Sequence, residues 1–342
     1  MDGCEETTGV TTVVSISQRA RIIGTGSYVP PKRLTNADLE QMLDTSDEWI
    51  YSHTGIRERR IAGDDISTSD MAVEAIRQAL DMSGCCPEDV DMVIAGTSTS
   101  DYRMPSTASV IQERLGLTNA GAFDVVSACA GFLNGLIVAR SLIESGAYGT
   151  IVVVGAEKLS SVTNYEDRNT CVLFGDGAGA VVTATDNDDH GVLSSFIRSD
   201  GSKRNLLWIP VGGVKYPYTP DFSYDGSDKL YMNGPDLYRV AVREMYNASA
   251  KAIEGAGVSP QDISLIVPHQ ANIRIIQGVA KRLDVGMDRV VVNIDKYGNT
   301  SSASIPMALD EANRAGRIKP GDLVLMVALG SGLIWGASVV RW

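Results

Sequence analysis

The chain has 342 residues, of which 44% are hydrophobic and 21% are charged. This composition is typical of a folded globular protein and excludes a disordered or collagen-like chain. Its 30 Lys and Arg residues against 42 Asp and Glu residues give a net charge of −12. A strongly acidic chain is poorly suited to general binding of nucleic acid or of an anionic membrane surface, so we expect neither as a partner.

The cysteines show no disulfide or metal-binding pattern. The chain has five cysteines, an odd number, and none of them forms the C-x-x-C pair typical of zinc ligands. They are Cys4, Cys85, Cys86, Cys129 and Cys171. Residues 1–17 have neither the basic start nor the apolar core of a signal peptide. The sequence therefore predicts a cytoplasmic protein without a metal site.

The first half of the chain alternates between helix-like and strand-like segments. Apolar residues at helical spacing predict a helix over 71–82, and short apolar runs predict strands at 91–95 and 122–126. Residues 133–143 are apolar almost all round, which is typical of a helix buried at the centre of a fold. The polar segment 186–228 is interpreted as an excursion that links two halves and lines an entrance.

The second half predicts further strands, at 265–267 and 290–293. Residues 323–340 carry no charge and are long enough to span a bilayer. The sequence Gly330-Ser331-Gly332 interrupts this stretch, so we expect two buried strands joined by a tight turn.

The chain also repeats itself about half its length further on. The pattern G-x-x-P-x-D-[VI]-x-[ML]-[VI]-[IV] occurs at 84–94 and again, without a gap, at 257–267, which fixes the offset of the repeat. Two copies of an alternating helix–strand pattern predict an α/β fold with mainly parallel sheets. We place the halves at residues 20–190 and 191–342, with helices between two sheets.

Cys129 lies where a predicted strand meets the central helix. The neighbours Ala128, Ala130 and Gly131 are small and allow another group to approach closely. A helix N-terminus lowers the pKa of a thiol and supplies N–H donors for an oxyanion. Because a buried cysteine is more often only a small apolar side chain, Cys129 alone supports a nucleophile as a hypothesis.

The second half supplies partners for this cysteine. His269 follows the strand at 265–267, and active sites of α/β folds gather at the carboxyl ends of strands. Asn299 follows the strand predicted at 290–293 and is interpreted as the counterpart of Cys129, displaced by three positions from the strict offset. Three such residues at strand ends of a repeat favour a catalytic site made of Cys129, His269 and Asn299.

Six ordered motifs give the sequence a specific resemblance. It resembles β-ketoacyl-acyl carrier protein synthase III, a family of condensing enzymes in the thiolase superfamily, from residue 22 to residue 342. The motifs are DTSDEWI at 44–50, TGIRER at 54–59, ACAGF at 128–132, FGDGAGA at 174–180, PHQAN at 268–272 and GNTS at 298–301. Elongating ketosynthases use a Cys-His-His set and thiolases a second cysteine, so the Cys-His-Asn set points to this family.

The resemblance implies a thiolase-like five-layered αβαβα fold, a homodimer and a decarboxylative Claisen condensation. Cys129 would take up a short acyl group, acetyl in the first instance, from its CoA thioester, and the backbone N–H groups of Cys129 and Ser331 would hold the oxyanion. His269 and Asn299 would then stabilise the charge formed when malonyl-acyl carrier protein loses CO₂. The implied product is a β-ketoacyl-acyl carrier protein that initiates fatty acid synthesis. No cofactor is implied, because acyl-CoA and the carrier protein are substrates.

The resemblance also assigns binding residues. Trp49 and Arg168 would enclose the CoA adenine, and Met104 would reach into the acyl pocket of the partner subunit. Arg239, Arg274 and Lys281 form a basic patch that would suit the acidic carrier protein, although such a patch can also be a solvated helix face.

Three features depart from the family pattern. His53 stands where a family member often has Arg, the turn at 330–332 is Gly-Ser-Gly instead of Gly-Gly-Gly, and residues 1–19 precede the usual start. Serine has less backbone freedom than glycine, so the turn accepts it only where its φ is not left-handed.

Two other functions remain open. One is a ketosynthase of polyketide or other secondary metabolism, which would use the same chemistry. The more distant one is a papain-like cysteine hydrolase, which has the same order of Cys, His and Asn but a different context around its cysteine.

Overall fold

Two β-sheets dominate the architecture, and the computed structural model describes residues 18–342. The first sheet contains β1 (Arg19–Tyr28), β4 (Met92–Gly96), β5 (Gly121–Val125), β6 (Thr150–Lys158) and β7 (Asp176–Asp186). The second contains β8 (Gly191–Ser199), β11 (Leu265–Pro268), β12 (Leu323–Gly330) and β13 (Ile334–Arg341). The strand orders are β1-β7-β6-β4-β5 and β11-β12-β13-β8.

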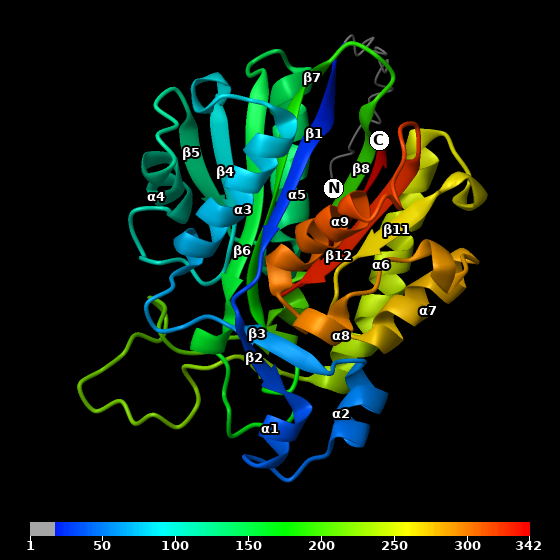
Figure 1. Ribbon diagram of the computed structural model, residues 1–342. Coiled ribbons are helices and arrows are strands. Elements are labelled where there is room, and N and C mark those ends of the chain that lie inside the picture. Colours follow the sequence, from blue (N-terminus) through cyan, green and yellow to red (C-terminus); the bar gives the residue numbers. More distant parts are fainter. Residues whose placement is uncertain (1–17) are drawn as a thin grey trace, which may run out of the picture.

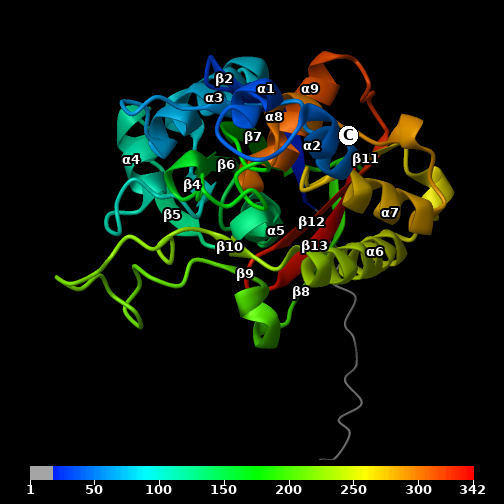
Figure 2. The same ribbon diagram turned by 90° about the horizontal axis from the view of Figure 1, so that it is seen from below.

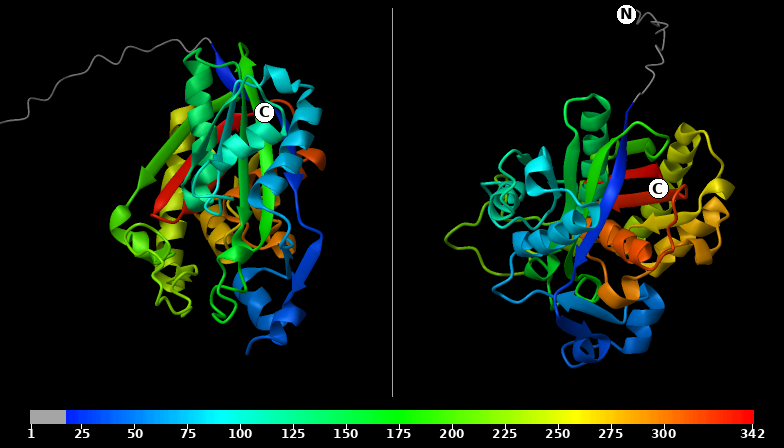
Figure 3. Two further views of the ribbon diagram at one scale, coloured as in Figure 1. Left: turned by 90° about the vertical axis from the view of Figure 1, so that its left-hand side faces the viewer. Right: turned by 45° about the horizontal axis from the view of Figure 1, so that its top comes forward.

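Helices cover the outer faces of the sheets and fill the space between them (Figure 1, Figure 3). On the outer face of the first sheet lie α3 (Thr68–Ser83) and α4 (Thr107–Arg114). Between the sheets lie α5 (Gly131–Glu144) and α9 (Ser304–Arg314), and α6 (Gly234–Ala256) and α7 (Ile273–Leu283) cover the second sheet. This order of layers confirms the expected αβαβα arrangement.

Smaller elements complete the chain. A cap at one end of the sheets is built from β2 (Lys32–Thr35), α1 (Asn36–Glu40), α2 (Asp47–Thr54) and β3 (Glu58–Ile61). The short elements β9 (Leu207–Trp208), β10 (Tyr231–Met232) and α8 (Ile294–Tyr297) lie in loops. The 3-10 helices are η1 (Pro87–Asp89), η2 (Ala128–Ala130), η3 (Leu159–Ser161), η4 (Gly201–Leu206), η5 (Pro260–Asp262), η6 (Met287–Arg289) and η7 (Ser301–Ala303).

The central position of α5 follows from its composition. Phe132, Leu133 and Leu136 are completely buried among strands of both sheets. Burial of each such side chain stabilises the fold by about 1.5–3 kcal/mol. A helix without a polar stripe has no face to offer to water, so it lies between the sheets, as predicted.

The duplication is visible in the backbone. Gly84 and Gly257 both end the long outer helix of their half in a left-handed conformation, with φ of 71° and 68°. η1 and η5 follow, each with a proline at its start. η2 and η7 are separated by the same offset as these two glycines, and each begins at a residue with positive φ, Ala128 at 46° and Ser301 at 49°.

This equivalence corrects the expected counterpart of the nucleophile. Because η2 and η7 match at the strict offset, the residue equivalent to Cys129 is Ser302, not Asn299. The two 3-10 turns also contact each other across the interface of the halves.

A longer connection in the second half explains the correction. Val93 pairs with Ala122 in the first sheet, and the equivalent Ile266 forms a single bridge with Val290. The chain from Val290 to the start of η7 is longer than the chain from Ala122 to the start of η2. The prediction of a strand at 290–293 is therefore wrong: the chain makes only that bridge and then turns into α8, and the added length carries Asn299.

Two other segments can be compared with the predictions. β8 occupies residues 191–199 of the expected excursion and pairs with β13, so the prediction for 186–228 is wrong in that part. β12 and β13 pair antiparallel down to Gly330 and Ile334, which confirms the two strands expected at 323–340. Within residues 18–342, no helix has the length and apolar character needed to cross a membrane.

The division of the halves at residues 190 and 191 stays a prediction. It agrees with the end of β7 at Asp186 and the start of β8 at Gly191 in the other sheet. The departure noted for residues 1–19 lies almost wholly in residues 1–17, outside the described part of the chain.

Close packing of β1 on α3 predicts the effect of a single methyl group. A Cβ at Gly24 would lie 2.2 Å from the carbonyl oxygen of Ala79 and 2.8 Å from the Cβ of Ser83. We expect Gly24→Ala to lower the free energy of unfolding by about 1–3 kcal/mol in urea titrations, because the backbone must shift. At Gly213 a Cβ would meet nothing within 4 Å. Gly213→Ala should change that energy by less than about 0.5 kcal/mol, and equal losses in both variants would contradict this packing.

Candidate active site

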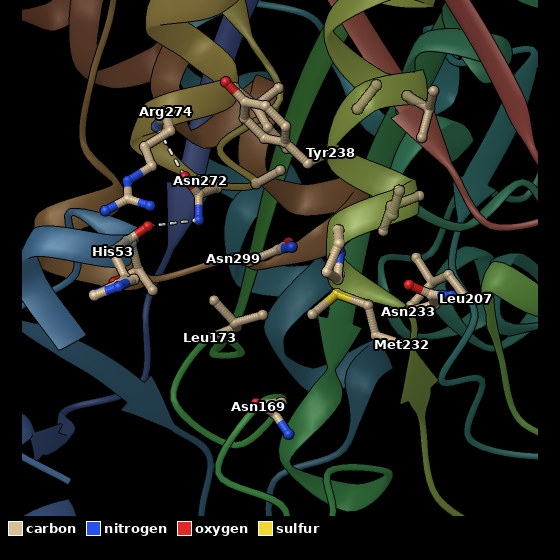
Figure 4. A pocket seen from close by; sticks show the side chains of 18 of the residues that line it. His53, Asn169, Leu173, Leu207, Met232, Asn233, Tyr238, Asn272, Arg274 and Asn299 are labelled. Atoms are coloured by element: carbon tan, nitrogen blue, oxygen red, sulfur yellow. Dashed lines mark hydrogen bonds between the residues drawn. The ribbon is translucent and has the colours of Figure 1, made fainter. Parts of the chain in front are cut away.

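A cavity of about 970 Å³ brings together the three residues predicted to be catalytic. Cys129, His269 and Asn299 line it and are buried, with exposed fractions of 7%, 2% and 6%. Figure 4 shows Asn299 at the centre of the cavity, with His53 and Arg274 on one side. The remaining wall is largely apolar and comes from both halves of the chain, including Leu173, Phe174, Leu207, Met232, Leu237, Met245 and Leu329.

Cys129 stands on a sharp strand-to-helix turn between β5 and α5. Ala128 adopts a left-handed φ of 46°, which is costly for a residue with a Cβ and is common at functional sites. The turn packs closely on β4, since a Cβ at Gly96 would lie 2.4 Å from the carbonyl carbon of Gly131. The backbone N–H of Ala130 donates to the carbonyl of Ser127.

Burial controls the protonation of Cys129. It raises the pKa of the thiol to about 12, a side-chain hydrogen bond with Ser301 lowers that pKa, and the charge of Glu157 raises it. Desolvation is the largest of these effects, and the net shift of the pKa is upward, opposite to the lowering expected from the sequence. In this cavity the group is a thiol and not a thiolate.

The turn after β12 lies against the backbone of Cys129. A Cβ at Gly330 would lie 2.5 Å from the carbonyl oxygen of Ser127 and 2.9 Å from the backbone nitrogen of Cys129. Gly332 takes the left-handed conformation of the turn, with φ of 116°, whereas Ser331 does not. The serine is therefore accommodated without backbone strain, and its hydroxyl donates to the carbonyl of Leu207.

His269 is held neutral at the end of β11. Its backbone N–H donates to the carbonyl of Val327 at 2.8 Å, which fixes the residue at the sheet edge. Burial lowers the pKa of its imidazole to about 3. Its Nδ1 lies 2.7 Å from Oγ of Ser304, at the start of α9. With the Ser304 hydroxyl as donor, the ring carries its proton on Nε2, the other nitrogen.

Asn299 is oriented by hydrogen bonds at both ends of its turn. Its backbone N–H donates to the carbonyl of Leu173 at 2.8 Å, and its carbonyl accepts from Gly175 at 3.0 Å. Its side-chain Oδ1 accepts the backbone N–H of Ser301 at 2.8 Å. Because Oδ1 is engaged, the Nδ2 group is the donor available to a ligand in the cavity.

Comparisons with known proteins identify the family of the chain. The model of 3-oxoacyl-[acyl-carrier-protein] synthase III matches residues 123–201, and the model of its C-terminal part matches residues 253–342. The β-ketoacyl-[acyl-carrier-protein] synthase III of Listeria innocua is 50% identical over 94% of this chain and 99% of its own length. The enzyme of that name from Caldanaerobacter subterraneus is 48% identical over 94% of this chain and 98% of its own. The chain belongs to the synthase III family.

Solved structures of the same family are similar to this chain in fold. The crystal structure of 3-oxoacyl-[acyl-carrier-protein] synthase III from Aquifex aeolicus has a TM-score of 0.88 and 46% identity, covering 94% of this chain and 100% of the other. The priming β-ketosynthase of the R1128 polyketide pathway has a TM-score of 0.88 at 34% identity, covering 94% and 96%. These matches confirm the resemblance and the thiolase-like fold. The chain is a condensing enzyme, that is, an acyltransferase.

The two residues that family resemblance assigns to adenine lie together outside the catalytic trio. The Arg168 guanidinium lies over the Trp49 ring at 4.8 Å and also donates to the carbonyl of Asp44 at 2.6 Å. An adenine between them would need about 7 Å, two van der Waals contacts of about 3.5 Å each. Trp49 lines the cavity and Arg168 does not. The expected sandwich is therefore not preformed, and the exposed Arg168 must swing aside to admit a base.

His53 has a role that the sequence did not reveal. Its ring stacks on Trp49 with centroids 4.6 Å apart, and its Nδ1 lies 2.7 Å from the carbonyl oxygen of Trp49. The i,i+4 spacing on α2 places both on one face, which is the sequence signal that points to this contact. In this synthase III chain, the departure from Arg gives an aromatic pair at the cavity wall.

The expected basic patch is only partly at the cavity. Arg239 and Arg274 line it and are exposed, whereas Lys281 lies further along α7 and does not line it. Arg274 is tethered by donating to the carbonyl of Ser52 at 2.9 Å, and Arg239 pairs with Asp236.

Met104 does not line the cavity of its own chain. Its side chain is 87% exposed, in the loop before α4.

Three residues around the site were not predicted from the sequence: Ser304 contacts His269, Ser301 contacts Asn299, and Glu157 contacts the turn η7. Their signal was weak, because serines at a helix start and a lone glutamate in a strand are common.

The protonation of Cys129 predicts its reactivity in the unacylated enzyme. Far below its pKa, a thiol is alkylated about tenfold faster for each pH unit, because the thiolate is the nucleophile. With a pKa raised to about 12, alkylation of Cys129 by iodoacetamide should keep rising through pH 7–10 without a plateau. Mass spectrometry of the peptide gives the rate, with the exposed Cys86 as internal reference. A plateau below pH 9 would show that the helix N-terminus outweighs burial.

Proposed function

We propose that this enzyme joins a short acyl-CoA primer, acetyl-CoA in the first instance, to malonyl-acyl carrier protein and so initiates fatty acid synthesis. The products are a β-ketoacyl-acyl carrier protein, CoA and CO₂. The observation that carries the proposal is the cavity itself. It connects buried Cys129, His269 and Asn299 to exposed Arg239 and Arg274, and none of its described lining residues is acidic. In a chain of net charge −12, such a lining favours a long anionic thioester.

In the first half-reaction, Cys129 attacks the thioester carbonyl of acyl-CoA. The new bond joins Sγ to the acyl carbon, the bond to the CoA sulfur breaks, and the thiol proton leaves with CoA. The backbone N–H groups of Cys129 and Ser331 hold the oxyanion of the intermediate. The contact of the neighbouring Gly330 with the Cys129 backbone supports this role, because it brings the two turns together.

In the second half-reaction, malonyl-acyl carrier protein loses CO₂ and leaves an enolate at its thioester oxygen. Nε2–H of His269 and Nδ2–H of Asn299 donate to that oxygen. A neutral imidazole suits this task, because it stabilises the enolate by hydrogen bonding without protonating it. The carbanion attacks the acyl-cysteine, and Cys129 is released as a thiolate that regains a proton from water.

Substrate binding follows from the residues at the cavity rim. Trp49 stacks on the CoA adenine once Arg168 moves aside, and the guanidinium then covers the base or its phosphates. Arg239 and Arg274 meet the acidic carrier protein at the rim, and Lys281 extends the patch along the same face of α7. The chemistry needs no metal and no further cofactor, since both substrates are thioesters.

A homodimer is supported by one side of the molecule. β5 is an edge strand of its sheet, and next to it Met104 and Val126 are 87% and 80% exposed. Segment 209–230 extends from the body on the same side (Figure 1, Figure 2). It is tied there by Arg103, which donates to the carbonyl of Gly212. A second copy would cover the edge and place Met104 against the acyl pocket of its partner.

A polyketide-priming role is the second candidate, because the R1128 priming ketosynthase shares this fold at 34% identity. Identities of 48% and 50% to β-ketoacyl-acyl carrier protein synthases III favour fatty acid synthesis. The cysteine hydrolase has no support from these matches. A cytoplasmic location agrees with the free cysteines at Cys85, Cys86, Cys129 and Cys171.

Acyl transfer to one cysteine tests the proposed chemistry. Incubation with acetyl-CoA should add one acetyl group to Cys129, seen by mass spectrometry of the intact chain and its peptides. Cys129→Ala should abolish the adduct, whereas Cys171→Ala should retain it, because Cys171 does not line the cavity. A panel of longer acyl-CoAs then gives the primer range. Absence of an adduct at Cys129 with every primer would overturn the proposal.

The two half-reactions should separate in variants of the other two residues. His269→Ala and Asn299→Ala should still acquire the acetyl group within a few-fold of the normal rate. Release of CO₂ from malonyl-acyl carrier protein should fall by about 100-fold or more, because a donor to the developing charge is lost. Loss of acetylation together with normal CO₂ release would contradict the assigned roles.

A further inference from the structure

Glu157 is a completely buried carboxylate that the condensation chemistry leaves without a role. It lies near the end of β6, with an exposed fraction of 0%. In the described residues it forms no ion pair, and its oxygens accept only from neutral donors. From the loop after β4, Oε2 accepts the hydroxyl of Thr99 at 2.6 Å and the backbone N–H of Ser98 at 3.1 Å. Retaining a buried acid without a cationic partner is energetically costly, so its contacts call for a functional explanation.

The remaining contacts of Glu157 cross to the other half of the chain. Its Oε1 accepts the hydroxyl of Ser301 at 3.0 Å and lies 3.1 Å from Oγ of Ser302, both in η7. At the strict repeat offset the counterpart of Glu157 is Gly330, which packs on the nucleophile turn η2. The end of each central strand thus contacts the 3-10 turn of the opposite half. Gly330 of β12 packs on the backbone of η2, and the side chain of Glu157 in β6 forms hydrogen bonds with η7.

Ser301 connects this carboxylate to Asn299. Its backbone N–H donates to Oδ1 of Asn299 at 2.8 Å and thereby decides which way the amide faces. Ser301 adopts a left-handed φ of 49°, which disfavours a residue with a side chain. The hydrogen bond from its hydroxyl to Glu157 holds Ser301 in this conformation. Glu157 is thus linked to Asn299, which lines the cavity, through Ser301 and its two hydrogen bonds.

We propose that Glu157 is a positioning residue for the second half-reaction: by holding Ser301 it aims the Nδ2 group of Asn299 at the enolate, and it does not assist the attack of Cys129. This inference rests on the proposed function, since it assumes that Asn299 serves decarboxylation. It divides the site into two supports, the Gly330 contact for thioester attack and the Glu157 contact for enolate stabilisation.

The proposal predicts different effects of Glu157 on the two half-reactions. Burial raises the pKa of the Glu157 carboxyl itself, and in its ionised form this group raises the pKa of the Cys129 thiol. Replacing the acid by an amide should therefore leave thiol attack unchanged or make it faster, while Asn299 loses its orientation. A loss of packing alone would slow both steps together.

The experiment compares the two half-reactions in Glu157→Gln, which keeps the shape of the side chain and replaces its carboxyl group by an amide. Acetylation of Cys129 by acetyl-CoA should proceed at least as fast as in the unaltered enzyme. Release of CO₂ from malonyl-acyl carrier protein by the preformed acetyl-enzyme should fall by about 10- to 100-fold, as expected for a misplaced catalytic group. Equal slowing of both steps, or unchanged CO₂ release, would overturn the inference.

Asp310→Asn is the matched control. Asp310 is another buried carboxylate, 2% exposed, that accepts the hydroxyls of Thr25 and Ser27 at 2.7 and 2.6 Å. Unlike Glu157 it also forms an ion pair, with Arg314 at 2.8 Å, and it does not line the cavity. Its loss should lower the thermal unfolding midpoint without changing the ratio of the two half-reactions. A change of that ratio equal to that in Glu157→Gln would mean that any lost buried acid has this effect, and would overturn the proposal.

Two further variants keep the result decisive. Ser301→Ala removes the same link from its other end, and CO₂ release by its preformed acetyl-enzyme should fall as far as in Glu157→Gln, even if Glu157→Gln folds poorly. Only this second step is compared in Ser301→Ala, because the side chain of Ser301 also forms a hydrogen bond with Cys129. Because both changes break one path, the double variant should release CO₂ no more than about 2- to 3-fold slower than the slower single variant; multiplied losses would contradict a shared path. Asn299→Ala distinguishes a failure of the proposed function from a failure of the role assigned to Glu157. If it releases CO₂ normally, the proposed function fails; if it loses CO₂ release while Glu157→Gln retains it, only the present inference fails.

Discussion

The structure depends on close backbone packing where the two halves meet. A Cβ at Gly155 would lie 2.2 Å from the carbonyl oxygen of Ser302, and one at Gly330 would lie 2.9 Å from the backbone nitrogen of Cys129. These glycines stand near the ends of the central strands β6 and β12, and each contacts the 3-10 turn that opens the central helix of the other half. Neither turn can therefore be placed without the opposite sheet. This explains why the site uses residues from both halves and why all three functional side chains converge on one cavity.

The same burial that joins the halves sets the protonation of the site. Desolvation holds His269 as a neutral imidazole and Cys129 as a thiol, because burial disfavours both charged forms. Both neutral forms suit the chemistry. A neutral imidazole with Ser304 at Nδ1 can donate from Nε2, and a thiol carries the proton that the departing CoA requires. Charge is concentrated instead at the rim, where Arg239 and Arg274 face solvent.

Duplication has left two turns with the same backbone and different chemistry. Ala128 and Ser301 share a left-handed φ, and Cys129 and Ser302 are equivalent positions. The first turn carries Cys129, the proposed nucleophile, whereas the second packs against Glu157 and donates a hydrogen bond to Asn299 in the longer connection before it. The pseudo-symmetry therefore covers the backbone of the two turns but not their side chains, because in the proposed mechanism each turn serves a different half of the reaction.

Much of the fold and the three candidate catalytic residues could be predicted from the sequence. Apolar runs and the pattern repeated at 84–94 and 257–267 determined the layered α/β fold, since buried strands and a buried central helix leave a distinctive composition. Local motifs made Cys129, His269 and Asn299 the candidate catalytic residues, and the structure brings the three side chains to one cavity. The tertiary structure decided what depends on non-local contact: the single bridge at Val290 in place of a strand, the equivalence of Ser302 with Cys129, and the contact of Arg168 with Trp49. It also decided the raised pKa of Cys129, because the sequence shows the helix N-terminus beside the thiol but not the burial that raises this pKa.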